Sequence, residues 1–174
     1  MCSSDLPGST LAGTKMTIRE FKVADQESVA KLQDEFMLEF FPEFRSDPRQ
    51  WNADIYHIDE HYSQRGGRFW VIEEDHEIVG FGGFRLVSPT VAEIKRVRLR
   101  SSCRGKGLGK AIVETIEHYC REHQITKILV DTDERLSIAK NMYAKLGYVL
   151  IRKEEQTEGL RKYVTCFFEK DLSC

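Results

Sequence analysis

Apolar residues recur every three to four positions in several stretches of the chain, which is the spacing of a helix with one buried face. The first stretch follows Asp25, a residue type that caps helices, and ends before Pro42. A second begins near Pro48, since proline is favoured in the first turn of a helix. The apolar positions are Val29, Leu32, Phe36 and Phe40 in the first stretch, and Trp51, Ile55, Ile58 and Tyr62 in the second.

Two further stretches show the same spacing in the second half of the chain. One starts after Gly107, and the other ends at Gly147, where glycine suits the left-handed conformation of a helix C-terminus. The first carries Leu108, Ala111, Ile112, Thr115, Ile116 and Tyr119, and the second carries Ile138 or Ala139, Met142, Tyr143 and Leu146. The chain is therefore expected to contain about four helices.

Shorter apolar or alternating runs separate these helices and predict strands. They cover residues 17–21, 68–73, 77–87, 92–100, 127–130, 149–153 and 163–169, with a polar turn at 155–159. Several neighbours in this series can pair as hairpins, while others are joined through a helix. The order predicts an α/β (α+β) fold with a central mixed, largely antiparallel sheet of about seven strands.

The length of 174 residues suits a single domain, expected at residues 16–172. Residues 1–15 are rich in serine, glycine and threonine and are interpreted as a flexible tail or an artificial leader. The net charge of −2 argues against a nucleic-acid partner, and no apolar run approaches the ~20 residues of a membrane span. The five cysteines lack metal-site or disulfide spacing, which favours reduced thiols in the cytoplasm and no metal.

The chemically most informative segment is the run from Arg104 to Lys110, with the sequence RGKGLGK. It joins a predicted strand to a predicted helix, and the N–H groups at the start of a helix attract anions. Its three glycines let an anion approach the backbone closely, and its three cations add positive charge. The segment therefore predicts a cradle for a phosphate or pyrophosphate.

Two common nucleotide motifs do not fit this cradle. A P-loop needs one more residue between its glycines and a hydroxyl where Ala111 stands. A dinucleotide fingerprint needs glycine where Lys110 stands.

The pattern Arg104-x-x-Gly107-x-Gly109 instead resembles the coenzyme A loop of the GNAT superfamily of N-acetyltransferases. Residues 92–100 look like the central strand that precedes this loop in the family, and residues 127–132 like the strand beside it. Residues 139–148 are similar to the late helix of the family, with Tyr143 and the closing pair Gly147-Tyr148. The order of the predicted elements is also that of the family, so the resemblance covers nearly the whole of residues 16–172.

The resemblance implies acetyl transfer from acetyl-CoA, the co-substrate, to a primary amine of a small molecule, peptide or protein. The central strand in the family is bulged, and Ile94 and Val97, three residues apart, support an irregular strand here. Main-chain groups of this strand and loop would then bind the cofactor. The candidate cofactor-binding residues are Val97, Arg98, Leu99, Arg104, Gly105, Lys106, Gly107, Leu108, Gly109, Lys110 and Asn141.

Two residues match catalytic positions of the family. Tyr143 would give a proton to the leaving thiolate, although its place on the apolar stripe also suits a core aromatic. Glu93 would accept the proton of the amine through water, because it matches a position used in this way in some members of the family. A plain ion pair with Lys95 or Arg96 is the alternative.

The acceptor site is less well defined by the sequence. In this fold it lies between the first two helices and the last strands, where acids would suit a cationic amine and aromatics a cation–π contact. That region contains Glu39, Phe40, Phe41, Glu43, Phe44, Trp51 and Tyr56. A different acyl-CoA donor, a non-catalytic sensor of coenzyme A, and a possible homodimer remain open at this point.

Overall fold

Seven strands form one mixed sheet in the order β1-β2-β3-β4-β5-β7-β6. The computed structural model describes residues 15–44, 52–159 and 161–173. Every neighbouring pair of strands is antiparallel except β4 and β5, which are parallel. The strands are β1 (Met16–Glu20), β2 (Arg68–Glu74), β3 (Glu77–Ser88), β4 (Val91–Leu99), β5 (Lys127–Asp133), β6 (Val149–Glu158) and β7 (Arg161–Asp171). The expected largely antiparallel sheet is confirmed.

Five α-helices are found among the described residues. They are α1 (Gln26–Phe40), α3 (Ala53–Tyr56), α4 (Ile58–His61), α5 (Leu108–Glu122) and α6 (Ser137–Lys145). The expected second helix is two short helices, because the backbone at His57 leaves the helical region. Its predicted start at Pro48 and Trp51 lies outside the described residues. In α6, Ala139 packs on the core while Ile138 is exposed, which settles the choice between them.

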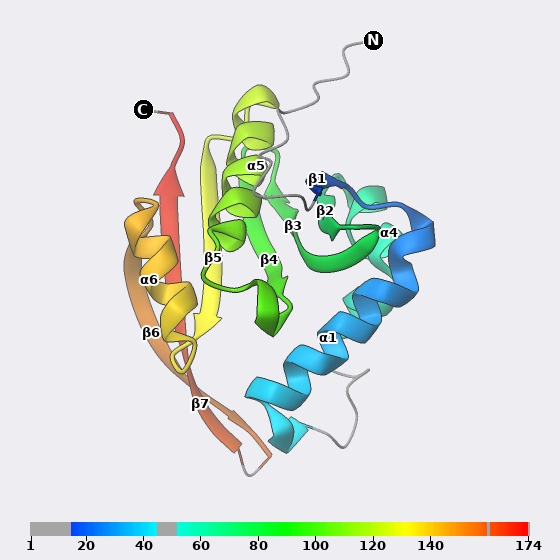
Figure 1. Ribbon diagram of the computed structural model, residues 1–174. Coiled ribbons are helices and arrows are strands. Elements are labelled where there is room, and N and C mark those ends of the chain that lie inside the picture. The colour runs from blue at the N-terminus through cyan, green and yellow to red at the C-terminus, as the bar shows by residue number, and fades with distance from the viewer. Residues whose placement is uncertain (1–14, 45–51, 160, 174) are drawn as a thin grey trace.

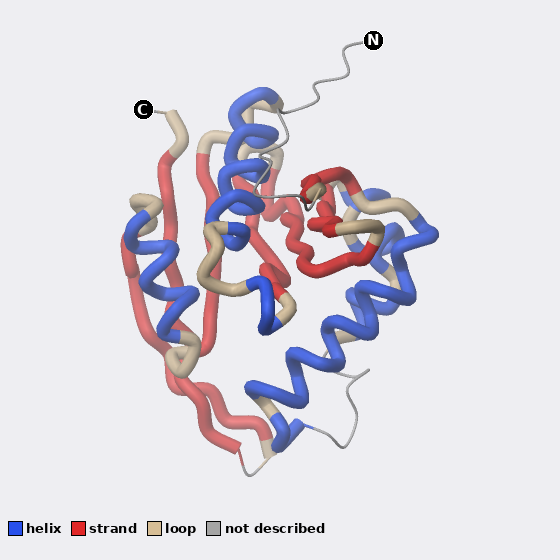
Figure 2. Tube along the Cα trace, viewed as in Figure 1, coloured by secondary structure: helices blue, strands red, loops and turns tan. Residues whose placement is uncertain are grey.

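The sheet buries a different core on each of its faces. Side chains alternate along β2, so Trp70 and Ile72 pack in one cluster while Phe69 and Val71 pack in the other. The first cluster includes residues of α5 and α6, and the second includes residues of α1, α3 and α4. Figure 2 shows α5 and α6 along the strands of one half of the molecule, with α1 well apart from them.

The C-terminal hairpin is longer than the sequence pattern predicts. Residues 155–158 continue β6 instead of forming a turn, and they pair with residues 161–164 of β7. These polar residues lie on a strand that pairs on one edge only, so polarity there indicates an exposed strand rather than a turn. None of the helices in the described part of the chain is both long and apolar enough to cross a membrane.

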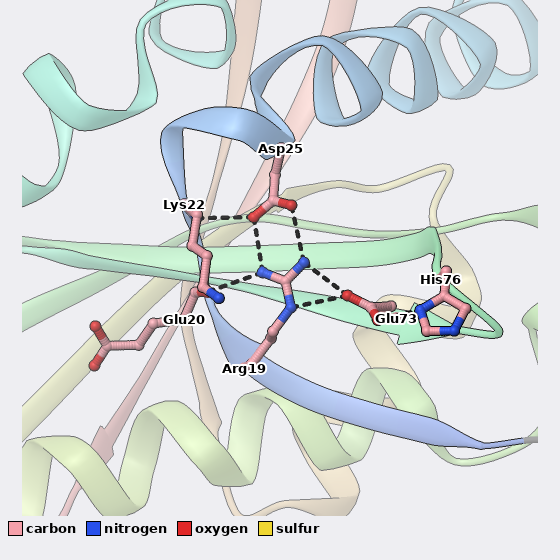
Figure 3. A network of polar contacts seen from close by, with 6 residues as sticks. All are labelled: Arg19, Glu20, Lys22, Asp25, Glu73 and His76. Atoms are coloured by element: carbon pink, nitrogen blue, oxygen red, sulfur yellow. Dashed lines mark hydrogen bonds and ion pairs between the residues drawn. The ribbon is translucent and has the colours of Figure 1, made fainter.

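A polar cluster fastens the first strand to the rest of the fold (Figure 3). Arg19 of β1 donates two hydrogen bonds to Asp25, of 2.8 and 2.9 Å, and two to Glu73 of β2, of 2.9 and 2.7 Å. The main-chain N–H of Lys22 also donates to Asp25. Asp25 directly precedes α1, so this cluster fixes the start of α1 against the sheet.

The parallel strands β4 and β5 separate after a short contact. Their pairing runs only from Val91 to Ile94 on β4 and from Lys127 to Val130 on β5. Figure 1 shows the two strands diverging toward their C-terminal ends. The remaining half of β4 therefore presents an unpaired edge toward β5.

Candidate active site

A β-bulge in β4 lies where the two strands separate. On the β3 side, Gly83 faces Lys95 and Phe81 faces Arg98, so two residues of β4 lie opposite Gly82. The extra residue, Arg96, has a φ of 61°, which costs energy for a residue with a Cβ. Its guanidinium donates to both carboxylate oxygens of Asp54, at 2.8 and 3.1 Å, and this pairing holds the bulge. The irregularity predicted between Ile94 and Val97 is confirmed.

The bulge turns particular main-chain groups toward the gap. The N–H of Arg100 donates to Val79 of β3, so Arg98 and Arg100 direct their main-chain groups to β3. Alternation along an antiparallel strand then directs those of Val97 and Leu99 away from β3, toward β5. This arrangement suits the role predicted for Val97 and Leu99, whereas the main-chain groups of Arg98 are directed to β3 and do not face the gap.

A cavity of about 260 Å³ occupies the gap between β4 and β5. Its walls come from both faces of the sheet: Met142 and Tyr143 belong to α6, whereas Arg98 packs on Phe36 of α1. Lys95 and Asp131 also line it, from β4 and β5. The cavity therefore lets a group bound beside α6 meet a group bound beside α1.

Tyr143 lies in the wall of this cavity and is buried. Its ring packs edge-on against Tyr148 at 5.4 Å, and no hydrogen bond of its hydroxyl is found within the described residues. Burial raises the pKa of Tyr143 above the usual value for tyrosine, and the positive charge of Arg98 opposes that rise. The hydroxyl is therefore protonated at neutral pH and can donate a proton into the cavity.

The glycine loop before α5 has the backbone shape that an anion cradle needs. Gly105 and Gly107 have φ values of 75° and 79°, and a Cβ added at either would meet only open space. Gly107 is the residue before the helix and has no side chain to cap it, which leaves the first N–H groups of α5 available. These features fit the pyrophosphate of coenzyme A. Figure 1 shows that the loop leads from the end of β4 to the start of α5.

Gly109 has a different role from the other two glycines. An added Cβ there would lie 3.1 Å from Sδ of Met142, tighter than an ordinary contact. A side chain at this position would require the side chain of Met142 to shift. The glycine thus lets α5 approach the helix that carries Tyr143.

The three cations of the loop were expected to add positive charge to the cradle, but Arg104 binds a carboxylate instead. The guanidinium of Arg104 donates to the Glu39 carboxylate at 2.5 and 2.8 Å and to the Leu99 carbonyl. The main-chain N–H of Arg104 donates to the carbonyl of Ser101. Arg104 therefore fastens the loop to α1 and does not direct its charge at the cradle. Lys106 and Lys110 are exposed, and Lys110 lies 3.7 Å from Glu114.

Glu93 is part of a charged cluster at the edge of the cavity. Nζ of Lys95 lies 2.9 Å from Glu93 and 2.7 Å from Asp131. Lys95 and Asp131 line the cavity, whereas Glu93 does not. Sequence reasoning missed Asp131; its position at the end of a buried strand, beside the predicted bulge, was the available signal.

The acids expected to bind an amine acceptor already have partners. Glu39 binds Arg104, and Glu43 binds Arg135 at 2.7 Å; these arginines lower the pKa of each carboxyl. The Tyr56 hydroxyl donates to Asp34. Of the expected acceptor residues, the structure places Phe41 in the cavity wall; Trp51 and the side chain of Phe44 lie outside what it describes. Asn141 is exposed on α6.

The site geometry agrees with the family that the sequence matches. Residues 29–148 match the model of the acetyltransferase (GNAT) family. Human N-acetyltransferase 8B is 31% identical over 103 residues, covering 55% of this chain and 45% of the relative. The Escherichia coli N-acetyltransferase YjgM is 30% identical over 90 residues, covering 50% and 54%. The chain spans about half the length of the curated relatives it matches.

Solved structures share the whole fold. An acetyltransferase of Staphylococcus aureus superposes with a TM-score of 0.79 at 21% identity, covering 91% of this chain and 99% of its own. YncA of Salmonella typhimurium, solved with its cofactor acetyl-CoA, gives 0.73 at 17% identity, covering 91% and 94%. A phosphinothricin acetyltransferase of Sinorhizobium meliloti, also in complex with acetyl-CoA, gives 0.76 at 17% identity, covering 90% and 88%. Because the family model matches most of the chain and the fold agrees, the protein belongs to the acetyltransferase (GNAT) family.

Proposed function

We propose that this protein transfers the acetyl group of acetyl-CoA directly to a primary amine. The observation that carries the proposal is the cavity between β4 and β5, with a buried tyrosine in its wall and an open helix start nearby. Bound acetyl-CoA would supply an activated thioester. The first N–H groups of α5 would bind its pyrophosphate, and main-chain groups of Val97 and Leu99 would bind the pantetheine.

Two proton movements accompany direct transfer, and this chain has a residue for each. A primary amine has a pKa near ~10.4 and must lose a proton before it attacks. Glu93 would accept that proton through water, while Asp131, on the cavity wall, would hold the ammonium group of the acceptor. Tyr143 would give its proton to the sulfur that leaves as the new amide bond forms.

Mixing the protein with acetyl-CoA and a panel of amines, with release of free thiol as the readout, tests this function. We expect at least one amine to release thiol well above the rate of hydrolysis. Calorimetric titration with coenzyme A provides the control for donor binding. Tight binding of coenzyme A without thiol release for any amine would contradict the proposed transfer and favour a sensor.

A further inference from the structure

Four cationic side chains line the cavity, and ion pairs neutralise two of them. Lys95 lies between Glu93 and Asp131, and Arg96 pairs with Asp54. The other two are Arg85 and Arg98, for which no ion pair with a described carboxylate is found. Glu93 is the cross-strand neighbour of Arg85, but its carboxylate binds Lys95. The cavity thus has uncompensated positive charge on the side that faces α1.

Arg98 is the more informative of the two arginines. Its Cζ lies 4.1 Å from the centre of the Phe36 ring, so an aromatic face supports the guanidinium. Nη1 donates to the carbonyl of Val97 at 3.0 Å. Nε is buried and has no partner, and Nη2 makes no hydrogen bond with the described residues. The free edge formed by Nε and Nη2 is the one that binds a carboxylate through two parallel hydrogen bonds.

An arginine in this state is costly unless an anion joins it. Buried donors without partners lose the hydrogen bonds that water would give them, and a buried charge without a counter-ion is disfavoured. Burial, with a smaller effect from the like charge of Arg96, lowers the pKa of Arg98 to about 10. Arg98 also lies within electrostatic reach of Tyr143. An anion bound to Arg98 would therefore lie near the proposed point of acetyl transfer.

We infer that the acceptor is a small amino carboxylate, such as an amino acid, whose carboxylate binds the Nε–Nη2 edge of Arg98. This inference rests on the proposed function and names the class of its substrate. Arg85 adds a second positive charge for the same carboxylate, and Asp131 faces the amine. The phosphates of the donor are assigned to the start of α5, so they do not neutralise these arginines. A cavity of about 260 Å³ suits an acceptor of this size.

Pairs of acceptors that differ only in the carboxylate test the inference. Each amino acid is compared with its own amide, and kcat/KM is measured by thiol release. We expect the wild type to prefer the best amino acid over its amide by about 100-fold. Arg98→Met should reduce that preference to less than about 3-fold, and Arg98→Lys should retain part of it. Arg65→Met, a change at an exposed arginine outside the cavity, should leave the preference intact. Equal rates for acids and amides in the wild type would overturn the inference, as would full preference in Arg98→Met.

A binding experiment separates this inference from the transfer reaction. N-acetyl amino acids and their amides have no free amine, so calorimetry in the presence of coenzyme A measures recognition alone. We expect the wild type to bind an N-acetyl amino acid at least about 30-fold more tightly than its amide. Such binding without any thiol release would support the role of Arg98 while the transferase proposal fails. Acetylation of amines that lack a carboxylate, with no binding of the N-acetyl amino acids, would reject this inference and keep the transferase. The wild-type measurements test whether a carboxylate is recognised even if the Arg98→Met variant does not fold.

Discussion

At the scale of single residues, burial determines the protonation state of the Tyr143 hydroxyl in the cavity. Burial raises the pKa of its hydroxyl, so the group stays protonated at neutral and moderately alkaline pH. A hydroxyl of this kind keeps its proton and can donate it, or a hydrogen bond, to a thiolate that forms beside it. Tyr148 and Phe168 fix the ring, so the hydroxyl has a defined position.

Tyr143→Phe removes the hydroxyl and keeps the ring. We expect kcat to fall by about 10²- to 10⁴-fold, while the affinity for acetyl-CoA stays within about 3-fold. Steady-state kinetics and calorimetric titration measure these two quantities. Tyr119→Phe, a change at a tyrosine that packs on the core outside the cavity, is the control and should keep kcat. An unchanged kcat in Tyr143→Phe would remove this residue as the acid.

Replacing the two carboxylates that bind Lys95, those of Glu93 and Asp131, should change different kinetic constants. Glu93→Gln removes the proposed base, so kcat should fall by about 100-fold at pH 7 and recover as higher pH deprotonates the amine. Asp131→Asn removes the proposed ammonium partner, so its main effect should be a KM for the amine raised by about 10-fold. Rate profiles from pH 6 to 10 distinguish the two outcomes. A Glu93→Gln enzyme with the wild-type profile would show that Glu93 only forms an ion pair.

Residue roles were only partly predictable from the sequence. The role of Tyr143 is predicted from its spacing to Gly147, which is a local pattern, and its place in the cavity wall is compatible with that prediction. The partners of Arg104 and Arg135 could not be predicted, because Glu39 and Glu43 are 65 and 92 residues away from them. Ion pairs between distant segments depend on the packing of α1 against the sheet, which local patterns do not describe.

At the scale of elements, the start of α5 depends on glycine for its conformation. Gly107 has a φ of 79°, and a residue with a Cβ is strained there whatever space surrounds it. The proposed binding of the pyrophosphate also needs the approach of an anion to the backbone, which a side chain would obstruct. Conformation and binding thus place separate demands on the same residue.

Gly107→Val tests both demands, with Gly159→Val as the matched control. Gly159 has a φ of 60° and the same open surroundings, but it lies in the turn after β6. We expect both variants to lose about 1–2 kcal/mol of unfolding free energy. Gly107→Val alone should weaken acetyl-CoA binding by about 10-fold or more. Chemical denaturation and calorimetry measure the two effects. Unimpaired acetyl-CoA binding in Gly107→Val would refute the assignment of the loop.

The elements themselves were largely predictable because their patterns are local. The apolar spacing after Asp25 and after Gly107 matches α1 and α5, and the spacing of Ile94 and Val97 indicated the bulge. The continuation of β6 from Glu155 to Glu158 was missed, because a polar run on an exposed edge strand resembles a turn. Strand length there is set by pairing with β7, a contact that composition does not reveal.

At the scale of the whole molecule, buried acids make stability depend on pH. The hydrogen bonds from Arg19 lower the pKa of Asp25. Burial alone would raise the pKa of Asp54, but the bonds from Arg96 and Tyr62 outweigh it and lower that pKa as well. In the unfolded chain an aspartate has a pKa of about 3.9. The unfolded state therefore binds more protons in acid, and stability is lost as the pH falls below about 4 through the lower pKa of the folded state.

Arg19→Met should reveal the contribution of Asp25 to this dependence. We expect the unfolding free energy at pH 7 to fall by about 2 kcal/mol, because Arg19 donates four hydrogen bonds to two carboxylates. The further loss between pH 5 and 2 should be smaller than in the wild type. Urea titrations across this range provide the measurement. Arg152→Met, which removes an exposed pair with Glu154, should change neither value by more than about 1 kcal/mol. An acid profile parallel to the wild type would show that Arg19 does not control the titration of Asp25.

The alternation of directions along β4 has a consequence for how such a protein diverges. Val97 and Leu99 turn their main-chain groups toward the gap, and the residue between them contributes its side chain to the cavity. Recognition by main-chain groups survives substitution, because every residue except proline has the same N–H and C=O. Under the proposed binding mode, residue 98 can therefore mutate, and with it the choice of acceptor, while the donor keeps its main-chain contacts. Descendants of one gene can in this way acquire new acceptors by single replacements on one strand.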